Sequence, residues 1–245
     1  MNAYLNEDEC VQDLQRGGLH ILQKKSGFRF GTDAVLLADF CAGRLGRRAA
    51  DMGTGTGVIA LLCCARNPRV HVDAFEVQKE MADMARRSVG MNGLEARICV
   101  HEQDVRLAPE TVGYEKMDAV FTNPPYNPRG TGLSSPYPEV ALSREMQMDI
   151  ETWVGCCGKL VRFGGRFFAV YPASRLAGML RAMEMARLTP KRIRFVCARS
   201  DRPPKLFLVE GIKGAGEGLL YEPALYTHDA EGPTLELRRI YGEMD

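Results

Sequence analysis

The sequence of 245 residues predicts an α/β fold in which helices cover both faces of a mostly parallel sheet of seven strands. Short apolar segments alternate along the chain with segments of helical periodicity. A glycine-rich segment, residues 51–57, separates an expected strand from an expected helix. Polar side chains lie at the carboxyl ends of four expected strands, at Asp51, Glu76, Asp104 and Asn123. Because ligands bind at the carboxyl ends of parallel strands, these four side chains predict one binding edge.

Composition sets limits on the protein class. A hydrophobic content of 45% is enough for a sizeable core, and a net charge of +1 excludes a uniformly basic surface. The longest apolar run, residues 58–65, is far below the roughly 20 residues that span a bilayer. The acidic N-terminus lacks the pattern of a signal peptide. We expect one domain, with a cap at 1–45 and a catalytic core at 46–245, in a cytoplasmic protein without membrane contact.

The cysteines and histidines do not predict a metal site. Eight cysteines are present, but no CxxC pair occurs, and the adjacent pairs Cys63-Cys64 and Cys156-Cys157 are poorly spaced to share a zinc ion. The four histidines are scattered. Reduced cysteines in the core and no metal are therefore expected.

The cap is expected to contain two short strands, at 19–23 and 28–30, around a glycine turn. A helix is expected from Gly31 to residue 41, with Thr32 or Asp33 as its N-cap. The first N–H groups of a helix attract anions, so Gly31 and Thr32 are candidate ligand-binding residues. The alternative is an ordinary capped helix.

The glycine-rich segment reads Asp51-Met-Gly-Thr-Gly-Thr-Gly57, between an expected strand at 47–52 and a helix at 58–66. A dinucleotide fingerprint requires glycine or alanine at position 58, where this chain has valine. Glycines let the backbone pass close to a ligand without a Cβ clash. The candidate ligand-binding glycines are Gly53, Gly55 and Gly57.

The next two expected strands also end at acids. Residues 70–75 form one strand, and Glu76 lies about 20 residues past the glycines, where a carboxylate accepts from ribose hydroxyls. A solvated glutamate is the alternative. Asp104 follows a strand at 96–101, and taken alone it is a surface loop residue.

The segment Asn123-Pro-Pro-Tyr126 follows a buried strand at 117–122. Pro124 and Pro125 lack N–H groups, so strand pairing stops at Asn123. The Asn123 side-chain oxygen and the Pro124 carbonyl can accept from one exocyclic amine, and Tyr126 can stack on the attached ring. This pattern predicts a site for a flat, amino-bearing group such as a nucleobase. A proline-rich turn is the alternative.

The remaining chain predicts further strands and one basic segment. A loop able to close over a substrate is expected at 127–140, helices at 143–162 and 173–187, strands at 165–171, 192–198 and 206–212, and a terminal hairpin from 219–228 and 234–240. The basic residues in 190–205 are expected to contact RNA, and the alternative is that they form an ordinary solvated face of a strand. These are Lys191, Arg192, Arg194, Arg199, Arg202 and Lys205. Lys24, Lys25 and Arg29 form a second candidate surface for RNA contact.

The chain resembles the Rossmann-like class I methyltransferases that use S-adenosylmethionine. The glycine segment, Asn123-Pro-Pro-Tyr126, residues 28–38 and Ile240-Tyr-Gly-Glu243 resemble in particular the bacterial tRNA (adenine-N6)-methyltransferases that modify a valine tRNA beside its anticodon. The resemblance implies tRNA as partner and S-adenosylmethionine as cofactor, with S-adenosylhomocysteine as product. It implies that Asp51 holds the cofactor ammonium, directly or through water, and Asp104 its adenine amine.

The resemblance also implies the catalytic residues. These are Asn123, Pro124, Pro125 and Tyr126, and Asn123 would lie against the cofactor as well. Two other readings remain open at this point. One is a guanine-N2 or protein glutamine-amide methyltransferase; the other is a non-catalytic protein that binds S-adenosylmethionine or RNA.

Overall fold

The computed structural model describes residues 4–26, 31–125 and 148–243. Within them, a nine-stranded sheet has the order β10-β8-β9-β7-β6-β3-β4-β5, with β11 also pairing with β8. The parallel strands of its centre and one side are β3 (Arg48–Met52), β4 (His71–Glu76), β5 (Ile98–Glu102), β6 (Met117–Thr122) and β7 (Val161–Pro172). β9 (Pro204–Lys213) runs antiparallel between β7 and β8 (Leu188–Cys197). The predicted α/β class with a mostly parallel sheet is confirmed.

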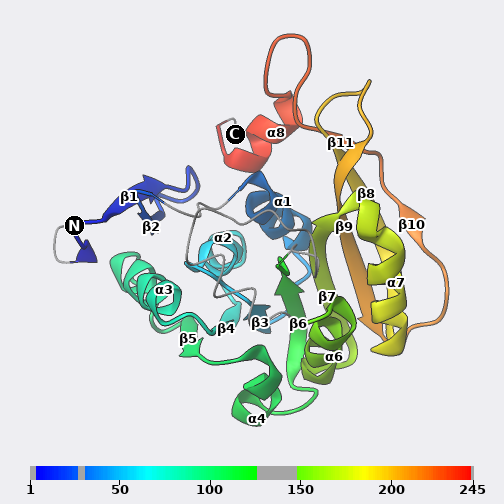
Figure 1. The fold of residues 1–245 in the computed structure, drawn as a ribbon, viewed down its shortest axis with the longest axis horizontal. Coiled ribbons are helices and arrows are strands. Elements are labelled where there is room, and N and C mark those ends of the chain that lie inside the picture. The colour runs from blue at the N-terminus through cyan, green and yellow to red at the C-terminus, as the bar shows by residue number, and fades with distance from the viewer. Residues whose placement is uncertain (1–3, 27–30, 126–147, 244–245) are drawn as a thin grey trace, which may run out of the picture.

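Helices cover both faces of the sheet (Figure 1). One layer contains α1 (Thr32–Cys41), α2 (Val58–Arg66) and α3 (Lys79–Met91), and the other contains α4 (Ala108–Val112), α6 (Ile150–Leu160) and α7 (Leu176–Met185). Side chains alternate between the two layers along each strand. Phe121 and Phe168 are buried in the first layer, whereas Phe75, Phe167 and Phe207 are buried in the second. Both faces of the sheet are therefore buried under helices, as is usual for a parallel sheet.

Elements with sharp sequence boundaries lie where they were predicted. The strand at 117–122 and the helix at 58–66 match β6 and α2 residue for residue. The helix expected at 143–162 is α6, which begins at Ile150 after Asp149, whose carboxylate accepts from the Thr152 N–H as N-cap. The loop expected at 127–140 lies outside the described residues. Six cysteines are buried in the core, as expected: Cys41, Cys63, Cys64, Cys156, Cys157 and Cys197.

The predicted terminal hairpin is wrong. β10 (Leu220–Tyr221) and β11 (Leu225–Tyr226) each pair in parallel with β8, so the sheet has nine strands rather than seven. Residues 235–241 form the helix α8 (Leu235–Tyr241), because Thr234 caps its start and Leu237 and Ile240 are buried three residues apart. α8 packs near α1 (Figure 1).

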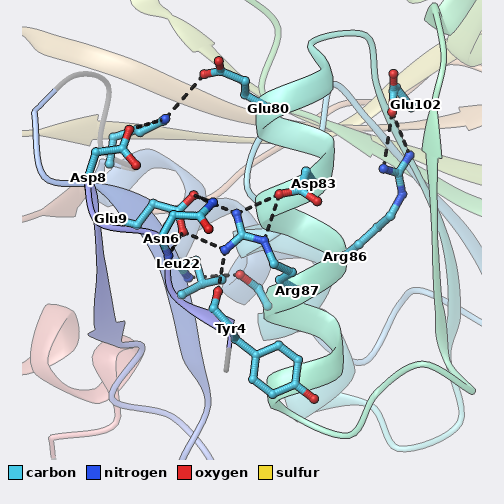
Figure 2. Close-up of polar contacts among 12 residues, drawn as sticks. Tyr4, Asn6, Asp8, Glu9, Leu22, Glu80, Asp83, Arg86, Arg87 and Glu102 are labelled. Atoms are coloured by element: carbon cyan, nitrogen blue, oxygen red, sulfur yellow. Dashed lines mark hydrogen bonds and ion pairs between the residues drawn. The ribbon is translucent and has the colours of Figure 1, made fainter. Parts of the chain in front are cut away.

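The first part of the predicted cap is a two-stranded hairpin of β1 (Glu9–Asp13) and β2 (His20–Lys24), separate from the main sheet, whereas its helix, α1, packs in the first helix layer. β2 overlaps the first strand predicted for the cap, but its partner precedes it in the chain, and the strand expected at 28–30 lies outside the described residues. Figure 2 shows how the hairpin docks on α3: the Arg87 guanidinium donates to both carboxylate oxygens of Glu9, at 2.6 and 2.7 Å. Among the described residues, no helix is long and apolar enough to cross a membrane.

Candidate active site

The sheet brings most of the predicted site residues to one edge. β3 lies between β4 and β6, with Met52 opposite Phe75 on one side and Thr122 on the other. The glycine turn, Glu76 and Asn123 therefore lie at the carboxyl ends of three adjacent strands, and these ends form one edge. Asp104 follows β5, the next strand along, two residues past its end.

The glycine turn holds a conformation that side chains rarely adopt. Gly53, Gly55 and Gly57 have φ values of 78°, 59° and 93°. A Cβ on Gly53 would lie 3.0 Å from Trp153, so this glycine also allows the aromatic ring to approach the turn. The Gly53 and Thr54 N–H groups donate to the Phe75 carbonyl at 3.0 and 2.9 Å. The backbone thus passes directly over the end of β4.

Asp51 is buried beneath this turn, with no exposed surface. Its Oδ2 accepts from the Thr54 hydroxyl at 2.7 Å, whereas Oδ1 has no hydrogen-bond partner among the described residues. Burial raises the pKa of the Asp51 carboxyl to about 7, against the lowering effects of the Thr54 hydroxyl and of the Ala60 N–H on α2. A buried acceptor without a hydrogen-bond partner costs free energy. A ligand amine or a bridging water that donates to Asp51 Oδ1 would remove this cost.

Glu76 ties the end of β4 to the glycine turn. Its Oε2 accepts from the Gly55 N–H at 3.0 Å and its Oε1 from the Gln78 N–H at 2.9 Å. Burial raises the pKa of the Glu76 carboxyl, although both N–H groups oppose the shift. A carboxylate oxygen can accept more than one hydrogen bond, which leaves capacity for the two hydroxyls of a ribose.

The Asp104 carboxylate is hydrogen-bonded to Arg106. Its Oδ1 accepts from the Arg106 N–H at 2.8 Å, and the Arg106 guanidinium pairs with both oxygens and lowers the pKa of the carboxyl. The carboxylate caps a short 3₁₀ turn, Val105–Leu107, so the residue is not in the plain surface loop that its sequence alone suggests. A contact with a cofactor amine requires Asp104 to share its oxygens with Arg106.

Asn123 and Thr122 are held from two helices. The Asn123 side-chain amide donates to Asp33 Oδ2 on α1 at 3.2 Å. The Trp153 indole N–H on α6 donates to the Thr122 hydroxyl at 3.0 Å, and this hydroxyl donates to the Met52 carbonyl at 2.7 Å. Pro124 is buried and Pro125 is exposed, while Tyr126 lies outside the described residues. Sequence reasoning missed Trp153, whose only signal was that the chain has one tryptophan.

The start of α1 differs from its prediction. The N-cap is Gly31, in an extended conformation and without a side-chain cap, rather than Thr32 or Asp33. The Thr32 hydroxyl accepts from the Tyr241 hydroxyl on α8 at 3.2 Å. The expected ligand contact of Gly31 and Thr32 stays a proposal.

The six basic residues predicted to contact RNA divide into two groups. Lys191, Arg192 and Arg194 have partners within the fold: Arg192 pairs with Glu210 and Glu222 over the Phe40 ring, Arg194 pairs with Glu236, and Lys191 donates to backbone carbonyls. The other three are exposed in and beside the turn that joins β8 to β9. These are Arg199, Arg202 and Lys205.

A cluster of metal-ligand type lies on β4 and β5. Among the described residues, Asp73, Cys99 and His101 on β4 and β5 bring their ligand atoms within 4.8 Å of one another. His101 Nε2 and Asp73 Oδ1 lie 2.9 Å apart and satisfy each other as a hydrogen bond, and Cys99 is exposed. The cluster is a hydrogen-bonded pair beside a thiol, so we assign no ion to it.

Comparisons with known proteins agree with this geometry. The family model described as "Methyltransferase small domain" matches residues 26–133, which include the glycine turn, Glu76, Asp104 and Asn123. A curated tRNA1(Val) (adenine(37)-N6)-methyltransferase of Porphyromonas gingivalis is 27% identical and covers 77% of this chain and 76% of its own. The enzyme of that name from Yersinia pseudotuberculosis is 28% identical over 84% of this chain and 82% of its own.

Solved structures show the same fold. A predicted O-methyltransferase from Agrobacterium tumefaciens has a TM-score of 0.69 and 27% identity, over 85% of this chain and 95% of its own. An S-adenosylmethionine-dependent O-methyltransferase from Thermotoga maritima has a TM-score of 0.53 over 79% of this chain and 69% of its own, at 19% identity. The Rossmann-like class I fold is confirmed, and the chain is an S-adenosylmethionine-dependent methyltransferase.

Proposed function

We propose that this methyltransferase acts on the N6 amine of an adenine in tRNA near the anticodon, the base that its curated relatives are named for. The observation that carries the proposal is Asn123 at the end of β6, beside the glycine turn, with its side-chain nitrogen turned toward Asp33. This places a side-chain carbonyl at the carboxyl edge, where an exocyclic amine can be received.

The residues beneath and beside the glycine turn fit S-adenosylmethionine. Asp51 Oδ1, a buried acceptor without a partner among the described residues, suits its ammonium or a water bound to it. Glu76 suits the ribose hydroxyls, and Asp104 the adenine amine. Gly53, Gly55 and Gly57 let the backbone approach the cofactor, while Gly31 and Thr32 offer the start of α1 to its carboxylate. When bound, this cofactor supplies a methyl group on an already activated sulfonium.

The chain's own contribution to transfer is placement of the acceptor. The N6 lone pair of adenine is delocalised into the ring, which makes the amine a poor nucleophile. Hydrogen bonds from its two protons to Asn123 Oδ1 and the Pro124 carbonyl would favour a pyramidal nitrogen, whose lone pair could form the new N–C bond while the methyl–sulfur bond breaks and its electron pair stays on the sulfur of S-adenosylhomocysteine. One proton leaves to water afterwards. In-line placement of two reactants contributes about 7–11 kcal/mol in well-oriented systems.

The remaining catalytic and RNA-binding residues complete the proposal. Pro125 keeps the backbone in the shape that follows β6, and Tyr126, outside the described residues, is assigned to stack on the adenine, worth about 1–3 kcal/mol. RNA contact is assigned to Arg199, Arg202 and Lys205, because the turn between β8 and β9 lies at the same edge of the sheet as Asn123. A tRNA substrate implies a cytoplasmic location.

The test is methyl transfer from labelled S-adenosylmethionine to total bacterial tRNA, followed by digestion to nucleosides. The expected product is labelled N6-methyladenosine. Label on guanosine, or on protein only, would favour the guanine-N2 or glutamine-amide reading instead. Cofactor binding without transfer to any of these acceptors would favour a non-catalytic protein.

A further inference from the structure

Asp33 contacts the acceptor site from a helix distant in sequence. Its Oδ2 accepts from Asn123 Nδ2 at 3.2 Å, and its Oδ1 accepts from the Ala34 N–H at 3.0 Å. The preceding Gly31 makes room for this side chain, because a Cβ there would lie 2.7 Å from Asp33 Oδ1. The carboxylate is thus anchored to α1 and turned toward the end of β6.

A carboxylate determines which way an asparagine side chain points. The two ends of an asparagine amide have nearly the same shape, so the side chain can present either its oxygen or its nitrogen in a given direction. An ionised carboxylate only accepts hydrogen bonds, whereas the amide nitrogen only donates. Asp33 can therefore bond Asn123 only through Nδ2, which turns Oδ1 away from Asp33.

We propose that Asp33 is a positioning residue that holds Asn123 as a hydrogen-bond acceptor for the substrate amine. The inference rests on the proposed function, since an amine substrate needs an acceptor at this point. A reversed Asn123 amide would set its own NH₂ group against the NH₂ group of the base. The negative charge of Asp33 also polarises the bonded amide, which strengthens its oxygen as an acceptor.

A purely structural role for Asp33 makes a different prediction. An acid in the first turn of a helix stabilises it by about 0.3–1 kcal/mol through the helix dipole. If that were its only role, changing Asp33 would alter the stability of α1 and leave the acceptor chemistry unchanged. Asp39, on the same helix and 3.6 Å from the Arg66 guanidinium, provides a matched control, because Asp39→Asn makes the same acid-to-amide change away from Asn123.

The first test compares transfer kinetics of the full chain and its variants on tRNA. Asp33→Asn should lower kcat about tenfold, with KM for tRNA and the Kd of S-adenosylmethionine within about twofold, because the lost interaction acts on the reacting amine. Asp39→Asn should keep the kcat of the unchanged protein. In an Asn123→Ala background, Asp33→Asn should have no further effect on kcat, since the residue it positions is absent.

A second measurement needs no turnover. The side-chain NH₂ signals of Asn123, identified in an ¹⁵N spectrum by their loss in Asn123→Ala, should shift in Asp33→Ala and stay in place in Asp39→Asn. Unshifted signals in Asp33→Ala, an unchanged kcat in Asp33→Asn, or a full Asp33→Asn effect in the Asn123→Ala background would each overturn the inference. Failure of the unchanged protein to methylate tRNA would instead overturn the proposed function, while the spectrum still tests the contact.

Discussion

Asp51 and Glu9 are both almost without exposed surface, yet the pKa values of the two carboxyls are shifted in opposite directions. The pKa of Asp51 is raised to about 7, because desolvation is opposed mainly by one hydroxyl group. The pKa of Glu9 is lowered to about 2, because the Arg87 guanidinium donates to both of its oxygens and Asn6 adds further hydrogen bonds (Figure 2). One carboxylate is buried without a cation, and the other with one.

The difference separates a site from a fold contact. A buried acid paired with arginine keeps its charge and holds two elements together, here the N-terminal hairpin and α3. A buried acid that lacks a cation lowers the stability of the fold. Binding of a positively charged ligand group beside it is therefore favourable. Asp51 lies under the glycine turn at the binding edge, whereas Glu9 lies on a hairpin outside the main sheet.

The largest effect is expected at Asn123, on the site side of this contrast. Asn123→Ala should lower kcat about 100-fold or more, as loss of one hydrogen-bonding group at a reacting centre does elsewhere. The Kd of S-adenosylmethionine, measured by calorimetry, should stay within about twofold. Glu76→Ala should do the reverse and weaken cofactor binding. Near-normal turnover in Asn123→Ala would remove this residue from catalysis, and unchanged affinity in Glu76→Ala would remove Glu76 from the cofactor site.

On the fold side, Glu9→Gln should lower the free energy of unfolding by about 2–3 kcal/mol at pH 7, because it leaves the partly buried Arg87 with only the exposed Asp83 as a carboxylate partner. The folded pKa of Glu9 is below the usual 4.5, so this stability is present above that value and is lost as pH falls toward 2. Asp83→Asn is the control, since Asp83 pairs with the same arginine from an exposed position and should cost less than about 1 kcal/mol. If urea unfolding showed equal losses of unfolding free energy in the two variants, the pairing of Glu9 with Arg87 would contribute no more stability than an exposed ion pair.

Asp51 should make cofactor binding depend on pH. If the cofactor ammonium favours the ionised form, affinity rises with pH through about 7, and the Kd at pH 6 should be about tenfold weaker than at pH 8. Asp51→Asn should bind more weakly at pH 8 and lose most of this dependence. The measurement is calorimetric titration of both proteins at the two pH values. A slope that survives unchanged in Asp51→Asn would assign it to another group.

The smallest effect is expected among the basic residues. Arg202→Ala should weaken tRNA binding a few-fold and reduce its salt dependence by about one phosphate contact. Arg192→Ala should lower thermal stability instead, because Arg192 lies between Glu210 and Glu222 within the fold. Filter binding over a range of salt concentrations, together with thermal melts, separates the two. If Arg192→Ala weakened tRNA binding and Arg202→Ala lowered thermal stability instead, the RNA-binding surface would have to be assigned to β8 rather than to the β8–β9 turn.

Sequence patterns were sufficient where the physical cause was local. The strand at 117–122 could be bounded because prolines end its ladder, and α2 because a glycine turn precedes it. The segment 234–240 was predicted as a strand of a hairpin, whereas the burial of Leu237 and Ile240 follows the helical period of α8. The pairing of Arg192 with Glu210, and of Asp33 with Asn123, joins residues far apart in the chain, and no local pattern could reveal it.

The most direct test of the account is methylation of a single valine tRNA transcript with adenosine at position 37, the position named for the relatives, beside the same transcript with guanosine there. The account predicts one labelled methyl group per tRNA, recovered as N6-methyladenosine, on the adenosine transcript and none on the other. Equal labelling of both transcripts, or transfer to the guanosine transcript alone, would contradict an acceptor site built around the N6 amine of adenine at that position.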